Sequence, residues 1–435
     1  MKPLARVVVA VVSLAAVATS YLLPNSQQTF SSPASEFAID VNPLPLSIVC
    51  PGSMVEVAGR SGVEVGKIER VDSASIKYQS QNSIEAPSRT ESFTTLAVEG
   101  EEQSTNLLSA IEYQVVDRPR ASGLIAGYCE QPVTSGWFVS GDGGAGKETV
   151  LVVANPNPVD TQLLLEIHFA GKVITERYVI GPLSEKLISL AAVVGVEPSY
   201  AVYFESGGGG LVAAIQHRYS DGLNSLGVSL DTAVRQAQTN LWIAPVSILA
   251  DGYERPRLRL FAPTAASDLT ITYHSRSTRT QMAELSLDSG ELFELEPQLP
   301  PGTYAIEIQS TEPVLASILN PALRPLDYQW ISPSERFNTL SLPLPSIDTE
   351  LALVNPSDSR IRITVEAETA QGNQISTIEL APTEIELLPV TGRSISINSS
   401  GEFIAALQLI SPSGYAVINP SENSNPGQSL SVIVR

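Results

Sequence analysis

The sequence contains few residues that bind metals or redox groups. Among its 435 residues are only two cysteines and three histidines. Zinc, copper, haem and iron–sulfur sites need clustered thiolate or imidazole ligands, which this chain can barely supply. We therefore expect no metal site and no cofactor.

Basic residues are also scarce. The chain has 26 Lys and Arg residues against 46 Asp and Glu residues, which gives a formal net charge of −20. A protein that binds DNA or RNA neutralises phosphates with a basic face, and the sequence shows no local basic patch. The charge therefore argues against a nucleic-acid binder. The hydrophobic fraction of 43% is enough for packed cores, so we do not expect a disordered chain.

Catalytic motifs are missing as well, because neither G-x-S-x-G nor S-x-x-K occurs. The loop Gly141–Lys147 (GDGGAGK) has the letters of a phosphate-binding loop, but Glu148 follows where Ser or Thr would hold magnesium. A strand-like run then follows in place of a helix, so we interpret the loop as a variable hairpin and predict that the protein is not an enzyme. A glycoside hydrolase with two catalytic carboxyl groups is still an alternative, because a sequence does not give the distance between two carboxyl groups.

The N-terminus carries an export signal. Lys2 and Arg6 precede an uncharged apolar run over residues 7–23, and Ala16–Ala18 offers an A-x-A cleavage site. The run of 17 residues also reaches the lower limit for a membrane span. Cleavage after Ala18 and a retained anchor both stay open, and only in the second case does the chain contact the membrane, through residues 7–23. Either outcome places the protein outside the cytoplasmic membrane, anchored on its outer face or secreted.

Cys50 and Cys129 are the only cysteines. In an exported chain they most simply form a disulfide with each other, and the alternative is two free thiols. The strand that contains Cys50 opens a predicted module and the strand before Cys129 closes it, so the bridge is expected to join the first strand to the last.

A pattern recurs about every hundred residues after Cys129. An apolar strand that ends in Pro is followed by a short polar turn and a second strand with alternating apolar residues. The three copies begin with Leu151–Pro156 (LVVANP), Leu258–Pro263 (LRLFAP) and Leu351–Pro356 (LALVNP).

Alternation with period two and frequent turns predict an all-β fold of antiparallel strands, each with one buried and one solvated face. We expect tandem immunoglobulin-like β-sandwich modules behind an N-terminal hydrophobic helix. The predicted boundaries are 1–23 for the signal peptide or anchor, 24–43 for a flexible linker, and 44–130, 131–235, 236–338 and 339–435 for four modules.

Histidine and tryptophan residues fall on the predicted strands. The alternation places His168 and His274 on solvated faces, and we interpret all three histidines, with His217, as exposed strand residues. Trp137 and Trp242 open their modules and are expected to anchor the module cores, whereas Trp330 is expected at a junction. A sugar-binding platform would need additional exposed aromatic residues, and aromatic residues make up 6% of the chain.

The stretch Cys129–Pro132 (CEQP), followed by Trp137, Gly141 and the strand Leu151–Pro156, resembles an actinobacterial exported family of unknown function. In that family a C-x-x-P … W-x-x-x-G stretch precedes repeated N-P strands behind an N-terminal hydrophobic segment. This chain departs from the pattern with Phe138, where a second Trp is common, and with its GDGGAGK loop. The resemblance implies an envelope or secreted protein without assigned catalytic residues, often encoded near a membrane glycosyltransferase.

These observations favour a non-catalytic cell-envelope protein that acts as a scaffold, an accessory subunit or a ligand-presenting array of modules. One alternative is a carbohydrate-binding or accessory role in envelope glycan synthesis, with a membrane glycosyltransferase or an envelope polysaccharide as partner. Another alternative is an adhesin. The ligand, the oligomeric state and weak calcium binding by acidic loops are not readable from the sequence.

Overall fold

The structure is a computed structural model that describes most of the chain. The described residues are 35–40, 46–57, 67–80, 84, 86–98, 108–195, 197–250, 255–275, 279–281, 284–323, 326–421 and 429–434. They fall into two compact units, one formed by residues 1–43 with 426–435 and the other by residues 44–425.

The first unit contains one pair of antiparallel strands, β1 (Ser35–Asp40) and β33 (Ser429–Val434). Strand β1 lies within the stretch 24–43 that we predict to be a linker. The predicted signal peptide or anchor, 1–23, lies outside the described residues. No helix in the described part of the chain is long and apolar enough to cross a membrane.

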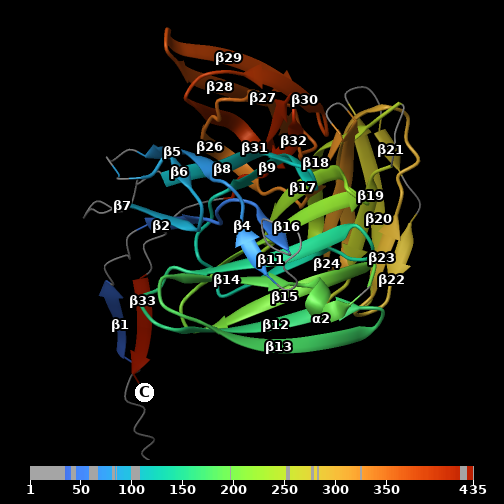
Figure 1. Ribbon diagram of the computed structural model, residues 1–435. Coiled ribbons are helices and arrows are strands. Elements are labelled where there is room, and N and C mark those ends of the chain that lie inside the picture. Colours follow the sequence, from blue (N-terminus) through green and yellow to red (C-terminus); the bar gives the residue numbers. More distant parts are fainter. Residues whose placement is uncertain are drawn as a thin grey trace, which may run out of the picture. The chain divides into compact units, whose positions relative to one another are not determined.

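The second unit is all-β, and its one helix within the described residues is the four-residue α2 (Ala191–Val194). We divide its strands into four quarters, which cover residues 46–128, 135–232, 238–331 and 336–418 (Figure 1).

Quarter 1 contains β2 (Leu46–Cys50), β3 (Val55–Val57), β4 (Ile68–Arg70), β5 (Ala74–Ser80), β6 (Arg89–Thr90), β7 (Thr94–Val98), β8 (Leu108–Arg118) and β9 (Ala121–Tyr128). Quarter 2 contains β10 (Ser135–Asp142), β11 (Lys147–Asn155), β12 (Thr161–Phe169), β13 (Lys172–Ile180), β14 (Ser184–Ser189), β15 (Ser199–Gly207), β16 (Val212–Asp221) and β17 (Asn224–Thr232). Quarter 3 contains β18 (Gln238–Ile248), β19 (Arg257–Phe261), β20 (Ser267–Ser275), β21 (Arg279–Gln281), β22 (Leu285–Leu287), β23 (Leu292–Leu295), β24 (Gly302–Leu323) and β25 (Leu326–Ile331). Quarter 4 contains β26 (Arg336–Pro343), β27 (Asp348–Val354), β28 (Ile361–Thr369), β29 (Gly372–Leu380), β30 (Ile385–Val390), β31 (Ser394–Ser411) and β32 (Gly414–Ile418).

One strand order recurs. In quarter 2 the sheets have the orders β10-β15-β12-β13 and β14-β11-β16-β17, and in quarter 4 the long strand β31 serves both β26-β31-β28-β29 and β30-β27-β31-β32. Strand β24 plays the same double part in quarter 3, whereas quarter 1 has the four-stranded sheet β6-β5-β8-β9 and two short strand pairs. The predicted boundaries of four separate modules stay a prediction, since residues 44–425 form one compact unit.

Alternating residues on these strands form the core. In β12, Leu163, Leu165 and Ile167 are buried, while Leu164 and Glu166 on the opposite face are less covered. This is the period of two expected for a strand whose faces meet different surroundings.

The recurring N-P pair in quarters 2 and 4 has a structural cause in its asparagine. Asn155 Nδ2 donates to the backbone carbonyls of Val159, Ile180 and Gly181 at 2.8–3.0 Å, and its Oδ1 accepts the N–H of Asn157. Asn355 makes the same four bonds to the residues 200 positions later, since 355 − 155 = 200. One buried amide thus ties two turns together in each quarter.

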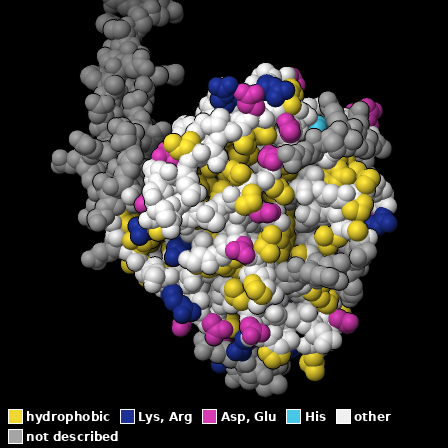
Figure 2. All heavy atoms as spheres, turned by 90° about the horizontal axis from the view of Figure 1, so that it is seen from above, with side chains coloured by type: hydrophobic (Ala, Val, Ile, Leu, Met, Phe, Trp, Pro, Cys, Tyr) yellow, Lys and Arg dark blue, Asp and Glu magenta, His cyan; other side chains and the backbone are white. Residues whose placement is uncertain are grey.

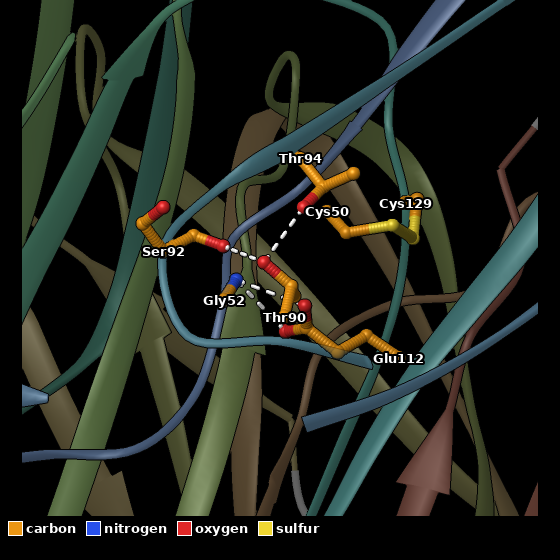
Figure 3. The surroundings of a disulfide bond; sticks show 7 residues. All are labelled: Cys50, Gly52, Thr90, Ser92, Thr94, Glu112 and Cys129. Atoms are coloured by element: carbon orange, nitrogen blue, oxygen red, sulfur yellow. Dashed lines mark hydrogen bonds between the residues drawn. A yellow bond between two sulfur atoms is a disulfide. The ribbon is translucent and has the colours of Figure 1, made fainter. Parts of the chain in front are cut away.

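A disulfide joins the two ends of quarter 1. Cys50 and Cys129 are bonded, the pairing predicted from the sequence, and both are fully buried. Beyond Cys50, the N–H of Gly52 donates to both carboxyl oxygens of Glu112 at 3.0 and 2.9 Å (Figure 3). Gly52 has φ of 92°, and a Cβ there would lie 2.7 Å from a backbone carbon of Ser92, so only glycine fits.

The quarters pack on one another in a cycle. Apolar clusters join quarter 1 to 2 through Val49 and Ala154, quarter 2 to 3 through Val139 and Phe261, and quarter 3 to 4 through Trp242. The core of quarter 4 also includes residues of β8 and β9 in quarter 1, which closes the cycle. Strands β9, β17 and β32 lie side by side at its centre (Figure 1).

Asp327 occupies the centre of this cycle and is fully buried. Its Oδ2 accepts the N–H groups of Leu124 in quarter 1 and Tyr415 in quarter 4, at 2.8 and 3.1 Å. Its Oδ1 accepts those of Val228 in quarter 2 and of Tyr328 in its own quarter, at 2.8 and 2.9 Å. Each quarter therefore gives one backbone donor to the same carboxyl group.

The residue before each donor occupies an equivalent position, and it is glycine in the three other quarters. These residues are Gly123, Gly227 and Gly414, against Asp327 in quarter 3. A Cβ at Gly123 or Gly227 would lie 2.5 Å from Asp327 Oδ1. Gly123 and Gly227 thus leave the space that Asp327 fills, and Gly414 lets its strand approach β9, since a Cβ there would lie 2.1 Å from the backbone nitrogen of Leu124.

Replacing both cysteines tests the contribution of the disulfide. The bridge spans 79 positions, and the chain-entropy estimate for that loop is roughly 4.5 kcal/mol. We expect the Cys50→Ser, Cys129→Ser variant to lose about that much free energy of unfolding, measured by urea titration. Two alkylatable thiols in mass spectra of the non-reduced exported protein would contradict the bridge.

Substitution of Asp327 tests the central contact. Asp327→Asn exchanges one acceptor oxygen for an NH2 group that faces two N–H donors, and each buried donor left unpaired costs about 1–3 kcal/mol. We expect a loss of about 2–6 kcal/mol in urea titration, with Asp221→Asn at an exposed turn as the control, within about 0.5 kcal/mol of the parent. Equal losses in both variants would contradict the special role of Asp327.

Candidate functional site

The outer faces of several sheets are covered by the neighbouring quarter and not by solvent. His217 and His274 are 0% and 1% exposed, so the prediction of exposed histidines is wrong for both, and His168 is partly buried. The ring of His274 stacks on Trp242 with centroids 5.1 Å apart, and its Nε2 lies 2.8 Å from Glu307 Oε2. The sequence alternation identifies an outer face but not what covers it.

Tryptophans lie at junctions between quarters. The expectation that Trp137 and Trp242 anchor the cores of their own modules is wrong. The ring centroids of Trp137 and of Phe261 in quarter 3 are 5.6 Å apart, and Trp242 packs with residues of quarter 4. Trp330 donates from Nε1 to the hydroxyl of Tyr219 in quarter 2, at 2.6 Å.

The GDGGAGK loop is a hairpin turn between β10 and β11. Lys147 opens a strand, and its Nζ donates to both carboxyl oxygens of Asp142 at 2.9 and 3.1 Å. A Cβ at Gly146 would lie 2.0 Å from the carbonyl oxygen of Ser220, which accounts for glycine there. The lysine is thus paired within its own loop, and the helix that a phosphate loop requires is replaced by β11.

One outer sheet face, on β12, β13 and β15 of quarter 2, keeps an open part. Leu164 is paired across the strands with Arg177 on one side and Glu205 on the other, and these three side chains share the outer face. The next row holds Glu166 and Tyr203. Apolar, acidic, basic and aromatic groups therefore stand side by side on one flat surface.

The aromatic part of this face is a tilted pair. The rings of Trp137 and Tyr203 have centroids 4.6 Å apart with an interplanar angle of 40°. The Tyr203 hydroxyl donates to Glu205 Oε2 at 3.3 Å, and burial together with the Glu205 charge raises the pKa of Tyr203. Glu166 Oε2 lies 3.6 Å from His168 Nε2.

A hollow of about 360 Å³ lies along the same strands, beginning one row beyond Glu166 and Tyr203, and neither Trp137 nor Tyr203 lines it. The hollow is lined by residues of β12, β13 and β15, namely Gln162, Leu163, Leu164, Arg177, Tyr178, Val179, Glu205 and Gly207. Its aromatic lining residue is Tyr178, and Glu205, Arg177 and Gln162 add a carboxyl, a guanidinium and an amide group. Such a lining can hold a ligand that offers both an apolar face and several hydroxyl groups.

This site was not identified from the sequence, although part of its signal is there. The alternation in β12 places Leu164 and Glu166 on the face opposite the core, but it does not bring β15 beside β12. That neighbour comes from the sheet order, which joins Tyr203 and Glu205 to Leu164. Within the described residues, no group of three His, Cys, Asp or Glu side chains could hold a metal ion.

A second hollow, of about 550 Å³, lies in quarter 4 beside Asp348, Glu350 and Ile410. It has no aromatic lining residue, so it offers less to a ligand than the face of quarter 2.

Four buried acids have raised pKa values. Burial raises the pKa of Glu112 and of Glu130 to about 7, with Arg70 and Arg235 respectively acting against the shift. Burial likewise raises the pKa of Asp231 to about 6 and that of Asp327 to about 8, against hydrogen bonds that lower it. All four sit where quarters or strands join and none lines the open face, so we assign them to the fold.

The fold should therefore be more stable in mildly acidic solution. For Glu112, Glu130 and Asp231 the folded chain holds the proton more tightly than the unfolded chain, so this stabilisation is complete below about pH 4 and is lost as the pH rises through about 6–7. We expect the calorimetric melting temperature to fall between pH 5 and pH 8.5.

The substitution Glu112→Gln replaces one of these titrating carboxyl groups with an amide that does not titrate. We expect this variant to reduce the slope of the free energy of unfolding against pH by up to about 1.4 kcal/mol per pH unit. A melting temperature that rises over this pH range in the parent protein would contradict the assignment.

Basic side chains are sparse on the surface, as the acidic composition leads us to expect. On the face shown in Figure 2, Lys and Arg side chains lie singly or in small groups, among acidic and hydrophobic side chains.

Comparison with known proteins gives a family but no activity. No curated protein matches the chain. A crystal structure from Thermotoga maritima, 1070, is 12% identical, and the match covers 24% of this chain and 96% of that one, with a TM-score of 0.23. The α-L-rhamnosidase of Streptomyces avermitilis, solved with L-rhamnose, is 8% identical over 86% of this chain and 56% of its own length, with a TM-score of 0.12. Both likenesses are too weak to carry an argument. A family model matches residues 79–384, and the chain therefore belongs to the family of unknown function DUF5719.

Proposed function

We propose that the protein is a non-catalytic, exported scaffold of the cell envelope that presents binding surfaces on a rigid core. The observation that carries this proposal is the cycle of quarters held by Asp327, because one carboxyl group with four backbone partners keeps four sets of loops in a constant arrangement. Rigid sheets with variable loops at their ends are a common way to present partner surfaces.

Two arginines support this role, since each of them makes a polar contact between two quarters. Arg70 of quarter 1 reaches Glu185 of quarter 2, with Nη2 to Oε2 at 2.6 Å. Arg259 of quarter 3 is fully buried, donates to the carbonyl of Val139 in quarter 2 at 2.8 Å and pairs with Glu294. Arg70 and Arg259 thus help to hold neighbouring quarters together.

The compartment belongs to the same proposal. A buried disulfide suits an oxidising environment, which agrees with export by the N-terminal apolar run. The actinobacterial origin implied by the resemblance and the immunoglobulin-like nature of the four quarters are also proposals. The two four-stranded antiparallel sheets of quarter 2 support the latter.

A second candidate function is carbohydrate binding, with envelope polysaccharide as the ligand. The Trp137–Tyr203 pair beside Glu205 and Arg177 favours it, because sugar rings stack on aromatic side chains while carboxyl and guanidinium groups bond their hydroxyls. A membrane glycosyltransferase as partner would fit either candidate.

Titration of the purified protein with fractionated envelope polysaccharide tests both candidates. If the open face of quarter 2 binds glycan, we expect quenching of tryptophan fluorescence and about tenfold weaker binding in Tyr203→Ala, since an aromatic contact contributes about 0.5–1.5 kcal/mol beyond burial. Tyr78→Ala, at another partly exposed tyrosine, should bind like the parent.

The same mixtures report on catalysis. We expect no new reducing ends at any protein concentration. Release of reducing ends that disappears in Glu205→Gln, with the circular dichroism spectrum unchanged, would overturn the non-catalytic proposal. Unchanged fluorescence with every polysaccharide fraction would remove the second candidate and leave the scaffold.

A further inference from the structure

Strand β29 is the outermost strand of its sheet in quarter 4. Its only strand partner among the described residues is β28, so one edge of its backbone is open along nine residues (Figure 1). An open edge of this length is a template for another strand, and natural proteins normally protect such edges with charged residues, proline or bulges.

The chain contains a second copy of this strand that allows a direct comparison. Strand β13 occupies the same place in quarter 2, and the registers Thr161 to Ile180 and Ile361 to Leu380 show that equivalent residues differ by 200. Strand β13 has three charged residues, Lys172, Glu176 and Arg177. It therefore has the protection that an exposed edge needs.

Strand β29 lacks that protection. Its equivalents of the three charged residues are Gly372, Ser376 and Thr377, and residues 371–378 are all uncharged and free of proline. Ile375 is 67% exposed, one of the most exposed large hydrophobic residues described. In a chain of net charge −20 this is an unusual edge.

We propose that β29 pairs with β29 of a second copy of this chain, antiparallel across a two-fold axis, and so joins the β26-β31-β28-β29 sheets of the two copies into one continuous sheet. A two-fold axis brings the same strand to itself, so no other partner is needed. Whichever residue from 375 to 378 lies on the axis, the one charged residue, Glu379, meets an uncharged one. The β-branched residues Ile375, Thr377 and Ile378 suit such a pairing.

The lack of charge on β29 also favours this strand as the contact between two copies. Two chains of −20 repel each other over most of their surface, and the repulsion is least where the approaching segments carry no charge. The association should therefore strengthen as salt screens the remaining charges, in contrast to an interface that is built on ion pairs. This inference is independent of the proposed function.

Sedimentation velocity of the full chain in a non-ionic detergent tests the pairing. We expect a monomer–dimer equilibrium that shifts to dimer between about 50 mM and about 500 mM NaCl. Ile375→Lys should weaken the dimer by at least about tenfold, because two lysines then face the same axis. Thr175→Lys, the equivalent position in β13, adds the same charge and should leave the dimer unchanged.

All three proteins keep residues 7–23, so association through that segment is the same in each. Hydrogen exchange should show residues 373–379 more protected at high protein concentration in the parent and in Thr175→Lys, but not in Ile375→Lys. A parent that is monomeric at all concentrations, or equal loss of the dimer in both variants, would overturn the proposal.

Discussion

Backbone N–H groups from all four quarters end on the two oxygens of Asp327. A buried carboxyl group must have its acceptors satisfied, and here the partners come from segments up to 203 positions away in the chain. The last strands of the quarters can approach closely enough only because glycine precedes the donor in three of them. The position of each sheet, and of the surfaces it presents, follows from this one contact.

The packing of the quarters in a cycle also determines which polar residues are buried and which are exposed to solvent. In an isolated sandwich, the outer faces of the sheets meet water. Here Trp242 lies on an outer face and yet is buried against quarter 4, and it covers His274. Arg259 is fully buried and contacts quarter 2 from quarter 3. Among the described residues, the open surfaces include the far end of one outer face in quarter 2, the hollow beside Asp348 and Glu350 in quarter 4, and the edge of β29.

Period-two alternation and the recurring Pro turns were sufficient to predict an all-β chain, and the two cysteines to predict their bond, because both depend on local pattern or on simple counting. The alternation could not reveal that outer faces are covered, since a residue such as His274 has the same local pattern in either case. Nor could it single out Asp327, one of 46 acidic residues, whose role depends on three glycines in distant strands. The open face was missed because Tyr203 and Leu164 become neighbours only through the strand order.

The three glycines and the single aspartate make the quarters non-interchangeable. A chain built from four identical copies of quarter 2 would have glycine at every central position, and its four N–H groups would face an empty space. Four copies of quarter 3 would bring four carboxyl groups into a space that holds one. The difference between quarter 3 and the other quarters at this position thus matches one carboxyl group to four backbone donors.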